Sequence, residues 1–333
     1  MKATAAEINK IFTNFTKLKA LVIGDLMVDS YVFGKVDRIS PEAPVPIIHV
    51  KSTESRLGGA ANVALNLAAL GIKPILAGVI GADTEGRQFA RLLKKHGLEE
   101  KGVVTSVNRV TTVKTRIIGN NAQMLRIDEE NTESLDKADK EKFLSMLSRL
   151  ILNDSPHVVI FEDYDKGVID EDIIAHVVKT CKGRKIPVCV DPKKRNFLAY
   201  EKVTLFKPNL KELREGLKLD SNLGEEDDLF HAVKKLEKKL DNHLSLVTLS
   251  ERGILVSHKG HKTIIPAHKR TIVDVSGAGD TVIAVASACV AQGVEPTLMA
   301  ALANMAGGLV CEKPGVVPID AAEFKAEALK LLK

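Results

Sequence analysis

The sequence has 333 residues, with no tryptophan, three tyrosines and four cysteines. The cysteines are Cys181, Cys189, Cys289 and Cys311. No two of them have C-x-x-C spacing, and no His and Cys cluster has the spacing of a zinc site. We therefore expect four buried thiols that behave as small apolar side chains in a reducing compartment.

Long apolar runs and strong charge are also missing. Residues 1–15 contain no apolar stretch of the kind found in a signal peptide, and no apolar run approaches the ~18 residues that cross a bilayer. Lys and Arg total 48 against 43 Asp and Glu, a net charge of +5 without a basic block. This balance predicts a cytoplasmic protein that binds neither membrane nor nucleic acid.

Several nucleotide-binding motifs are absent. No G-x-x-x-x-G-K-[ST] occurs, which excludes a P-loop enzyme, and the GVIG at 78–81 does not match the G-x-G-x-x-G of a dinucleotide-binding dehydrogenase. The HKGH at 258–261 matches the H-x-G-H of a class of nucleotidyltransferases. It lies between two strand-like runs, a position that favours a hairpin turn instead.

Short apolar runs alternate with helical patterns along the chain, and 45% of the residues are apolar. Strands are predicted at 18–24, 75–79, 158–161, 188–190, 205–206 and 244–249. Helices are predicted at 62–70, 86–96, 170–181, 210–217 and 227–241. This alternation predicts an α/β fold, a parallel sheet sandwiched by helices, which binds ligands at the carboxyl ends of its strands.

Two β-rich segments interrupt the alternation. Residues 31–55 include three prolines, and residues 103–128 alternate Thr, Val, Arg and Ile. We expect both segments to form antiparallel strands of a small β-sheet lid over a site. Because no repeat or linker divides the chain, the prediction is one domain, 1–333, that includes this lid.

The segment Thr271–Val282, TIVDVSGAGDTV, has two glycines directly before Asp280 and an apolar helical run. Gly277 and Gly279 allow a sharp turn that exposes backbone N–H groups, and a helix starting there adds its positive dipole end. Together these features predict an anion hole suited to phosphate, with Asp280 placed to accept a proton from an attacking hydroxyl. An ordinary helix entry with a dipole-matched acid explains these residues equally well.

Glycines and polar residues near the N-terminus form two more candidate sites. In LGGAANVA, Gly58 and Gly59 permit close approach of a ligand, and Asn62 can bond sugar hydroxyls or simply cap a helix. Asp25 and Asp29 follow the first predicted strand. Their carboxylates can accept hydrogen bonds from a polyol, or they are solvated loop acids.

Two further motifs suggest phosphate chemistry. In KPNLKE, Asn209 and Glu212 lie one helical turn apart, which suits a hydrated Mg²⁺ near phosphates or, alternatively, a capping box. Lys114 and Arg116 share a strand face, and Arg126 follows. These cations can clamp a substrate phosphate, or form a solvated face.

The ordered set GG..N, N-x-x-E and D-x-S-G-A-G-D resembles the ribokinase-like (PfkB) carbohydrate kinase family, across nearly the whole chain. The resemblance implies a parallel α/β core with a β-sheet lid over the sugar. It also implies ATP, Mg²⁺ and an aspartate base, and often a monovalent cation such as K⁺ near the anion hole.

Within that family, VDRISPEAPVPIIHV (36–50), FEDYDKGV (161–168), VDPKKRN (190–196) and AALANMAGG (300–308) resemble segments of one subgroup. These kinases phosphorylate O1 of D-glycero-β-D-manno-heptose 7-phosphate in lipopolysaccharide precursor synthesis, often fused to a C-terminal adenylyltransferase. Because the sequence ends at Lys333, we expect the stand-alone kinase. Residues 311–314, CEKP, depart from the smaller, Gly-containing segment of the family.

The resemblance implies roles residue by residue. The catalytic set is Asp280 as base with Gly277, Ala278 and Gly279 as anion hole. The substrate set is Asp25, Asp29, Gly58, Gly59, Asn62, Arg116, Arg126 and Lys166, with the two arginines assigned to the substrate's phosphate. The ATP and Mg²⁺ set is Asp191, Lys193, Asn209, Glu212, Ser276 and Asn304, and Asp274 is the candidate monovalent cation ligand.

Other functions remain open at this stage. A kinase for ribose, fructose or a fructose phosphate would share the motifs, and a regulator that binds sugar or nucleotide without catalysis would share the fold. The presence of both Asp280 and the N-x-x-E pair favours an enzyme. The expected partners are a sugar phosphate and ATP, and the exposed edges of the lid predict a homodimer.

Overall fold

The computed structural model describes residues 3–332, and its centre is a nine-stranded sheet of order β13-β12-β11-β10-β9-β8-β1-β4-β5. The parallel strands are β1 (Lys19–Gly24), β4 (Lys73–Gly81), β5 (Gly102–Ser106), β8 (Val158–Glu162), β9 (Val188–Asp191), β10 (Leu205–Phe206) and β11 (Leu244–Thr248). Antiparallel strands β12 (Ile254–His258) and β13 (His261–Ile265) complete one edge.

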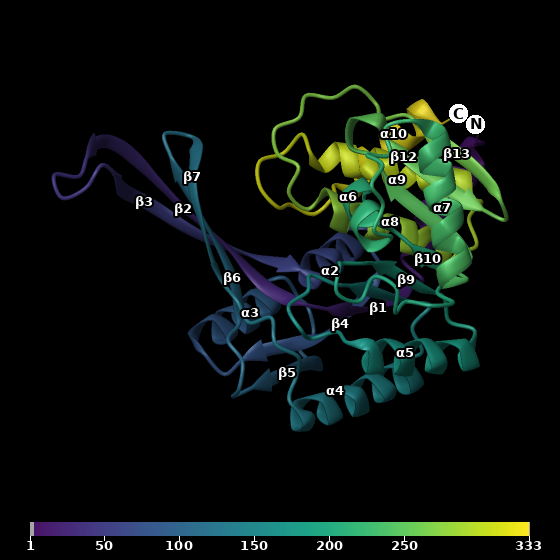
Figure 1. Ribbon diagram of the computed structural model, residues 1–333, viewed down its shortest axis with the longest axis horizontal. Helices are drawn as coiled ribbons and strands as arrows, with labels where there is room; N and C mark the ends of the chain where they lie inside the picture. Colours follow the sequence, from purple (N-terminus) through teal and green to yellow (C-terminus); the bar gives the residue numbers. More distant parts are fainter. Residues whose placement is uncertain (1–2, 333) are drawn as a thin grey trace.

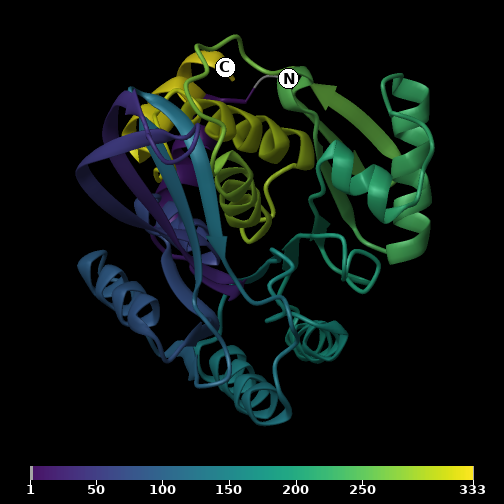
Figure 2. The same cartoon turned by 60° about the vertical axis from the view of Figure 1, so that its left-hand side comes forward.

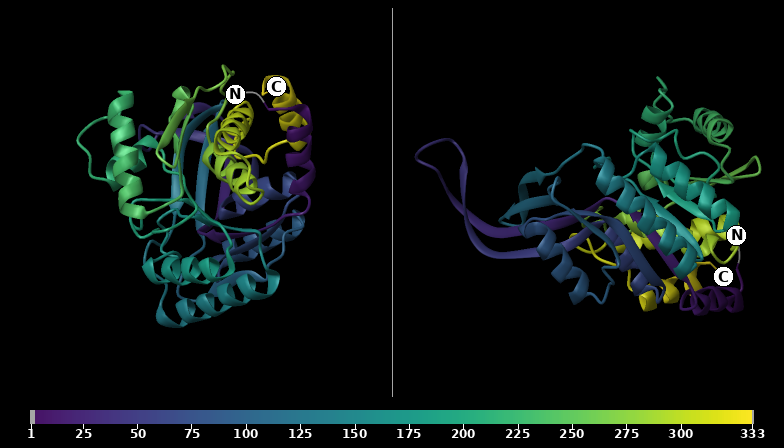
Figure 3. Two further views of the ribbon diagram at one scale, coloured as in Figure 1. Left: turned by 90° about the vertical axis from the view of Figure 1, so that its right-hand side faces the viewer. Right: turned by 90° about the horizontal axis from the view of Figure 1, so that it is seen from below.

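Helices cover both faces of this sheet (Figure 1; Figure 3, left). One face holds α1 (Ala5–Phe15), α2 (Ala60–Ala69), α3 (Thr84–Lys95), α8 (Ala278–Val290), α9 (Pro296–Val310) and α10 (Ala321–Leu331). The other holds α4 (Lys137–Arg149), α5 (Glu171–Arg184), α6 (Leu210–Gly216) and α7 (Glu226–Leu240). Short turns η1 (Leu150–Asp154) and η2 (Ser250–Arg252) complete the helical segments.

The side chains of each strand divide between two cores because successive residues point to opposite faces. In β1, Ala20 and Val22 join the core under α2 and α8, whereas Leu21 and Ile23 join the core under α4 and α5. All four of these side chains are fully buried. A strand buried on both sides reads as a continuous apolar run, which is why LVI was recognisable in the sequence.

The order of the strands reverses beside β1. The chain runs from β1 outward through β4 to β5, and then returns to build β8, β9, β10 and β11 on the other side of β1. The loops after β1 and β8 therefore leave the sheet on opposite sides, at the point where parallel α/β sheets bind ligands. Asp25 and Tyr164 follow these two strands.

A second sheet projects from this body (Figure 1; Figure 3, right). It contains β2 (Leu26–Ile39), β3 (Pro46–Gly59), β6 (Thr112–Gly119) and β7 (Ala122–Glu129), in the order β3-β2-β6-β7. We call these four strands the lid. The β2–β3 and β6–β7 pairs are antiparallel, and β2 pairs with β6 in parallel.

Two expectations about the lid were wrong. Residues 102–106 belong to the central sheet, where β5 pairs with β4, so the second lid segment begins at Thr112. The central lid pair is parallel rather than antiparallel. An edge strand with one buried face shows the same two-residue alternation as a lid strand, and the sequence pattern carries no information on its partner.

Other expectations were confirmed. Each predicted strand and helix has a counterpart within a few residues, and HKGH forms the turn between β12 and β13, with Lys259 and Gly260 in the left-handed region at φ 50° and 83°. All four cysteines are buried and unpaired. Among the described residues, no helix is long and apolar enough to cross a membrane.

Candidate active site

The SGAGD segment forms the turn that begins α8. Gly277 precedes the helix with φ 79°, a left-handed conformation that favours glycine. A Cβ at Gly277 would lie 2.9 Å from the side-chain nitrogen of Asn62, so the turn also packs too tightly for a larger residue. The helix start at this turn is where the sequence predicts an anion hole, with Asp280 in the first turn. The N–H of Ala278 donates to the carbonyl of Val275 at 3.3 Å.

Asp280 is held at both carboxylate oxygens. The side-chain amide of Asn62 donates to Oδ2 at 2.6 Å, and the hydroxyl of Tyr164 donates to Oδ1 at 2.9 Å. Only 5% of the residue is exposed, and this burial raises the pKa of Asp280 to about 6 although both hydrogen bonds lower it. A carboxylate with this pKa is suited to accept a proton near neutral pH.

Asn62 is held in place by neighbouring side chains of α2 and α8. The side-chain amide of Asn66 donates to the backbone carbonyl of Asn62 at 2.9 Å, and the hydroxyl of Thr281 donates to the Asn66 side-chain oxygen at 3.0 Å. All three side chains are fully buried. The Asn66 amide also donates to the side-chain oxygen of Asn62 at 3.4 Å, so these bonds join α2 to α8 and orient the Asn62 amide toward Asp280.

Asp25 organises the loop after β8 rather than facing an open cavity. Its carboxylate accepts hydrogen bonds from the backbone N–H groups of Tyr164 (2.7 Å), Lys166 (3.1 Å) and Val168 (3.4 Å). Burial, followed by the charge of Asp163, raises the pKa of Asp25 to about 6. The Asp25 carboxylate thus shapes the loop carrying Tyr164, and the sugar contact predicted for Asp25 stays a prediction.

The other substrate-side residues lie where β2 and β3 leave the body. Asp29 is buried and forms an ion pair with Arg116 of β6. Gly58 lies against the Asp29 carboxylate and Gly59 against the backbone of Asp25, in both cases too close for a side chain. The predicted residues of this group are therefore together, with Arg116 engaged by Asp29.

A second cluster of charges lies at the ends of β8, β9 and β10. The ammonium group of Lys207 pairs with Asp191 Oδ2 at 2.7 Å, with 3% and 6% of the two side chains exposed. Glu162 is buried beside them, and burial together with the charges of Asp191 and Asp280 raises its pKa well above the usual range. Glu162 Oε2 and Asp191 Oδ1 have no hydrogen-bond partner among residues 3–332.

Asn209 and Glu212 form the capping box of α6. The Asn209 side chain accepts from Glu212 N, and Glu212 Oε2 accepts from Asn209 N, both at 2.8 Å. The other carboxylate oxygen of Glu212 pairs with Lys193. The capping interpretation is thus correct, and it also places the Glu212 carboxylate beside Lys193 at the edge of the charged cluster.

A row of charges lines one face of the lid. Lys114 and Lys166 share Glu130, at 3.3 and 2.8 Å, and Lys114 also pairs with Asp128 at 3.1 Å. Arg126 pairs with Asp128 at 2.9 Å, and half of its side chain is exposed. In the register of β6 and β7, Lys114 lies opposite Asp128 and Arg116 lies opposite Arg126. These four side chains therefore share one face of the lid.

Asp274 lies on the loop before the anion turn, and Asn304 lies on α9. Asp274 accepts from Ser276 N at 2.9 Å and from Gly315 N at 3.0 Å, so its carboxylate joins two loops. The amide of Asn304 donates to the carbonyl of Pro266 at 3.0 Å. Asn304 therefore supports the segment between β13 and the anion turn.

Three members of the site were missed in the sequence. Glu162, Tyr164 and Lys207 directly follow or end parallel strands, at the edge where ligands bind. Their position after a strand was the available signal, but only Lys166 was selected from FEDYDKGV. Contacts between distant segments, such as Tyr164 with Asp280, have no counterpart in a local pattern.

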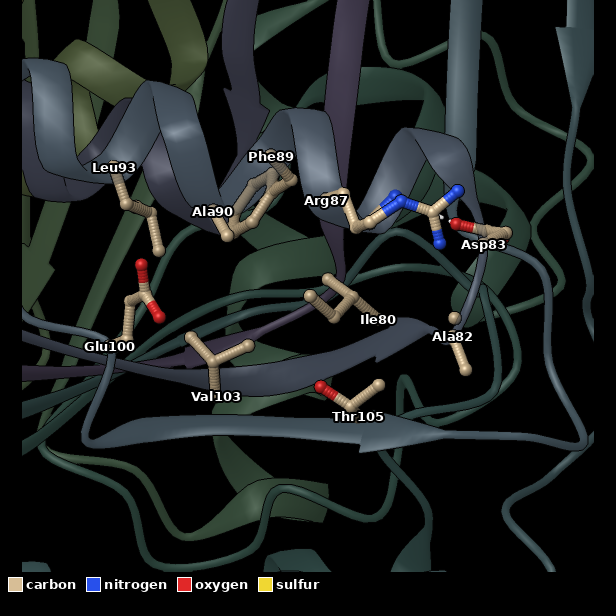
Figure 4. A pocket seen from close by; sticks show the side chains of 12 residues that line it. Ile80, Ala82, Asp83, Arg87, Phe89, Ala90, Leu93, Glu100, Val103 and Thr105 are labelled. Atoms are coloured by element: carbon tan, nitrogen blue, oxygen red, sulfur yellow. Dashed lines mark hydrogen bonds between the residues drawn. The ribbon is translucent and has the colours of Figure 1, made fainter.

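A cavity among the described residues lies away from this site. It has a volume of about 330 Å³ and lies between α3 and strands β4 and β5 (Figure 4). Its wall is mainly apolar and includes Ile80, Phe89 and Val103. None of its residues belongs to the network around Asp280, so this cavity is separate from the site.

The site as a whole has the features of a phosphotransferase. A buried aspartate of raised pKa lies at a helix N-terminus built to bind an anion, and lysines and buried carboxylates lie beside it under a lid. These are the parts that phosphoryl transfer needs: a base, a phosphate cradle and compensating charge. The architecture and this site define a phosphotransferase of the α/β class.

Comparison with known proteins supports the assignment to a phosphotransferase. The model of the pfkB family carbohydrate kinases matches residues 17–322, and the chain belongs to this family of ATP-dependent sugar kinases. The "Bifunctional protein HldE" of Methylobacillus flagellatus is 41% identical over 307 residues, 92% of this chain and 62% of its own length. The protein of the same name from Magnetococcus marinus is 39% identical, over 97% of this chain and 66% of its own length.

Solved structures confirm the fold. Arabidopsis thaliana ribokinase, complexed with ribose and ATP, superposes with a TM-score of 0.72 at 20% identity, over 92% of this chain and 98% of that one. Phosphofructokinase-2 from Escherichia coli, in complex with fructose-6-phosphate, gives 0.76 at 16% identity, over 95% and 98%. The ribokinase-like fold predicted from the sequence is therefore correct.

Proposed function

We propose that this kinase transfers the γ-phosphoryl group of ATP to O1 of D-glycero-β-D-manno-heptose 7-phosphate. The observation that carries the reaction type is Asp280, held by Asn62 and Tyr164 at the anion turn. The resemblance of four sequence segments to heptose phosphate kinases supports the sugar. The chain spans 62–66% of the length of the first two curated relatives, so no second activity is assigned to it.

Asp280 performs the proton chemistry in this proposal. Its ionised carboxylate accepts the proton of the attacking sugar hydroxyl, while Asn62 and Tyr164 keep both carboxylate oxygens oriented. The N–H groups of Gly277 and Gly279 stabilise the charge on the transferred phosphoryl group. Exclusion of water by the lid strengthens both interactions.

The residues present fit ATP with Mg²⁺. Glu162 and Asp191 each have a buried oxygen without a partner among the described residues, and Lys193 and Lys207 lie close to them. Within 3–332, no three His, Cys, Asp or Glu side chains are arranged to hold a metal ion by themselves. This arrangement suits Mg²⁺, which is usually held by one or two carboxylates together with substrate phosphates and water, and which neutralises phosphate charge.

The charged face of the lid is the proposed place for the phosphate that the sugar already carries. Arg116 is committed to Asp29, whereas Lys114, Lys166 and Arg126 share two carboxylates, Asp128 and Glu130. Three cations and two carboxylates leave one positive charge for an anion. We therefore propose that Lys114, Lys166 and Arg126, rather than Arg116, bind the phosphate group of the sugar.

Two finer features complete the proposal. Asp274, which joins the anion turn to the 311–316 loop, is the candidate ligand of a monovalent cation such as K⁺. The opposite, apolar face of the lid is the proposed surface for a homodimer. Leu125 and Ile127 are exposed by 55% and 44%, and alternate with the charged positions of β7.

The test is ATP consumption by the purified protein against a panel of sugars. D-glycero-β-D-manno-heptose 7-phosphate, fructose 6-phosphate, fructose 1-phosphate, ribose and fructose are compared, with Asp280→Ala as control. We expect turnover on the heptose phosphate, and a loss of about 10²–10⁴-fold in the variant without loss of ATP binding. Turnover on another sugar would overturn the substrate and leave the kinase mechanism in place.

A further inference from the structure

Arg56 of the lid reaches a loop on the nucleotide side of the molecule. Its guanidinium donates to the backbone carbonyls of Val316 at 3.0 Å and Pro314 at 3.4 Å, across 260 and 258 residues of sequence. A second side of the same group pairs with Glu54 at 2.7 Å. In Figure 2 the lid comes forward and lies beside the yellow C-terminal part, as these hydrogen bonds require.

Tyr31 fills the space between two guanidinium groups. Arg56 lies over its ring at 4.9 Å and Arg116 at 5.4 Å, and only 3% of the tyrosine is exposed. Its hydroxyl oxygen accepts from Val316 N at 3.3 Å. Cation–π contacts of this kind strengthen when they are removed from water, so the three side chains form one rigid stack.

The loop held by this stack also supports the anion turn. Gly315 N donates to Asp274, whose other oxygen accepts from Ser276 N. Val316 packs on Gly277, because a Cβ at that glycine would lie 3.3 Å from its side chain. A Cβ on Gly315 would lie 2.7 Å from the Arg56 guanidinium, so the lid and the loop are in direct contact.

At its other end the stack touches the sugar side. Arg116 pairs with Asp29, which lies against Gly58 where β3 enters α2. A continuous series of contacts therefore runs from Asp29 through Arg116, Tyr31 and Arg56 to the loop at 314–316, and then to the phosphate cradle. Such a series can carry coupling when its elements have discrete packed arrangements.

We propose that Arg56 and Tyr31 are positioning residues that couple closure of the lid over the sugar to formation of the phosphate cradle. Neither side chain touches the reacting atoms. Arg56 and Tyr31 hold the 314–316 loop, which holds Asp274 and the turn at Ser276 and Gly277, and a sugar bound beneath the lid tightens this series of contacts. The inference rests on the proposed function in one respect, namely that the sugar lies beneath the lid.

Coupling between the two ligands tests the proposal. The dissociation constant of the heptose phosphate is measured by calorimetry with and without a non-hydrolysable ATP analogue and Mg²⁺, and the ratio is the coupling factor. We expect a ratio of about five or more in the unaltered protein and a ratio near one in Arg56→Ala. The dissociation constant of each ligand alone should change by less than about threefold.

Matched variants separate coupling from a general structural effect. Glu54→Gln removes the ion pair but keeps the guanidinium contacts to the loop, so its coupling factor should remain that of the unaltered protein. Tyr31→Phe, which removes a single hydrogen-bond acceptor, should lower the factor partly. An unchanged factor in Arg56→Ala, or a factor of one in the unaltered protein, would overturn the proposal.

Hydrogen exchange of the ligand-free protein is a second test, and it does not depend on which sugar binds. Peptides that contain Gly315 and Ser276 should exchange about tenfold faster in Arg56→Ala, whereas peptides of α5 should not change. Equal exchange in the 314–316 loop contradicts the contact series. Failure to bind the heptose phosphate, combined with faster exchange in the variant, would reject the proposed substrate and retain the role of Arg56.

Discussion

Asp280 and its two donors illustrate how single residues set the chemistry. In the proposed reaction the Asp280 carboxylate must be ionised to accept a proton, and burial raises its pKa to about 6. The hydrogen bonds from Asn62 and Tyr164 favour the ionised form and so oppose this rise. Burial also raises the pKa of Asp25 to about 6, but only Asp280 accepts the Tyr164 hydroxyl, so loss of that hydroxyl identifies the contribution of Asp280 to the acidic side of the pH profile.

We predict that kcat/KM falls below a pH of about 6, approaching tenfold per pH unit. In Tyr164→Phe one donor is lost, the pKa of Asp280 rises further, and the acidic limb of the profile moves to higher pH. Steady-state rates between pH 4.5 and 8.5 measure both effects. A limb that stays in place in Tyr164→Phe would show that another group controls it.

Lys207 and Asp191 give a second prediction at this scale. Both side chains are almost completely buried, so Lys207→Met leaves a charge without its partner and should lower the free energy of unfolding by about 3–5 kcal/mol. Lys211→Met is the matched control, because Lys211 is 76% exposed and pairs with Glu215 at 3.9 Å. Its change should be below about 0.5 kcal/mol by urea denaturation.

If the two variants differ by less than about 1 kcal/mol, the Lys207–Asp191 pair does not contribute to the stability of the fold. Its role would then be confined to the bound nucleotide. The two losses of stability can be compared directly because each substitution replaces a lysine by methionine.

Among the elements, the loop between β8 and α5 depends on close packing. Gly167 has φ 79°, and a Cβ there would overlap the backbone carbonyl of Glu133. Gly97 has a similar φ of 69° but nothing within 4 Å of its Cβ position. The two glycines therefore separate backbone strain from steric overlap.

We predict that Gly97→Ala costs about 1–2 kcal/mol of unfolding free energy, from the left-handed conformation alone. Gly167→Ala should cost a further ~1–3 kcal/mol, because the Glu133 carbonyl must move. It should also reduce turnover, since this loop carries Tyr164. Equal losses of stability in the two variants would contradict the packing argument.

The sequence predicted the helices and strands better than it predicted the contacts between them. Doubly buried strands such as β1 read as apolar runs, and Gly71 and Gly97 marked the ends of helices because their positive φ values favour glycine. The membership of residues 102–106 in the central sheet was not predictable, since pairing depends on distant residues. For the same reason the turn around Asp280 was recognised, while Tyr164, Arg56 and Lys207 were not.

For the whole molecule, the lid decides how two copies would meet. Every residue of β7 is exposed, and apolar Leu125 and Ile127 share the face opposite to the charged one. We predict a homodimer in light scattering, and a monomer when both residues are replaced by Glu. Leu152→Glu, at a residue of similar exposure on η1, should leave the dimer intact. A monomer without any substitution would exclude lid pairing.

The connection of the lid to the body has a consequence for engineering. Only Asp25 separates β1 from β2, and β3 passes into α2 without a break at Gly59. A chimaera that receives a foreign lid therefore inherits two rigid splice points, each within a few residues of a site side chain. Exchange of residues 34–50, the outer half of the hairpin, should leave the site side chains undisturbed, because none of them lies in this range. A graft that extends inward to Asp29 or Gly58 would rebuild the reaction centre as well.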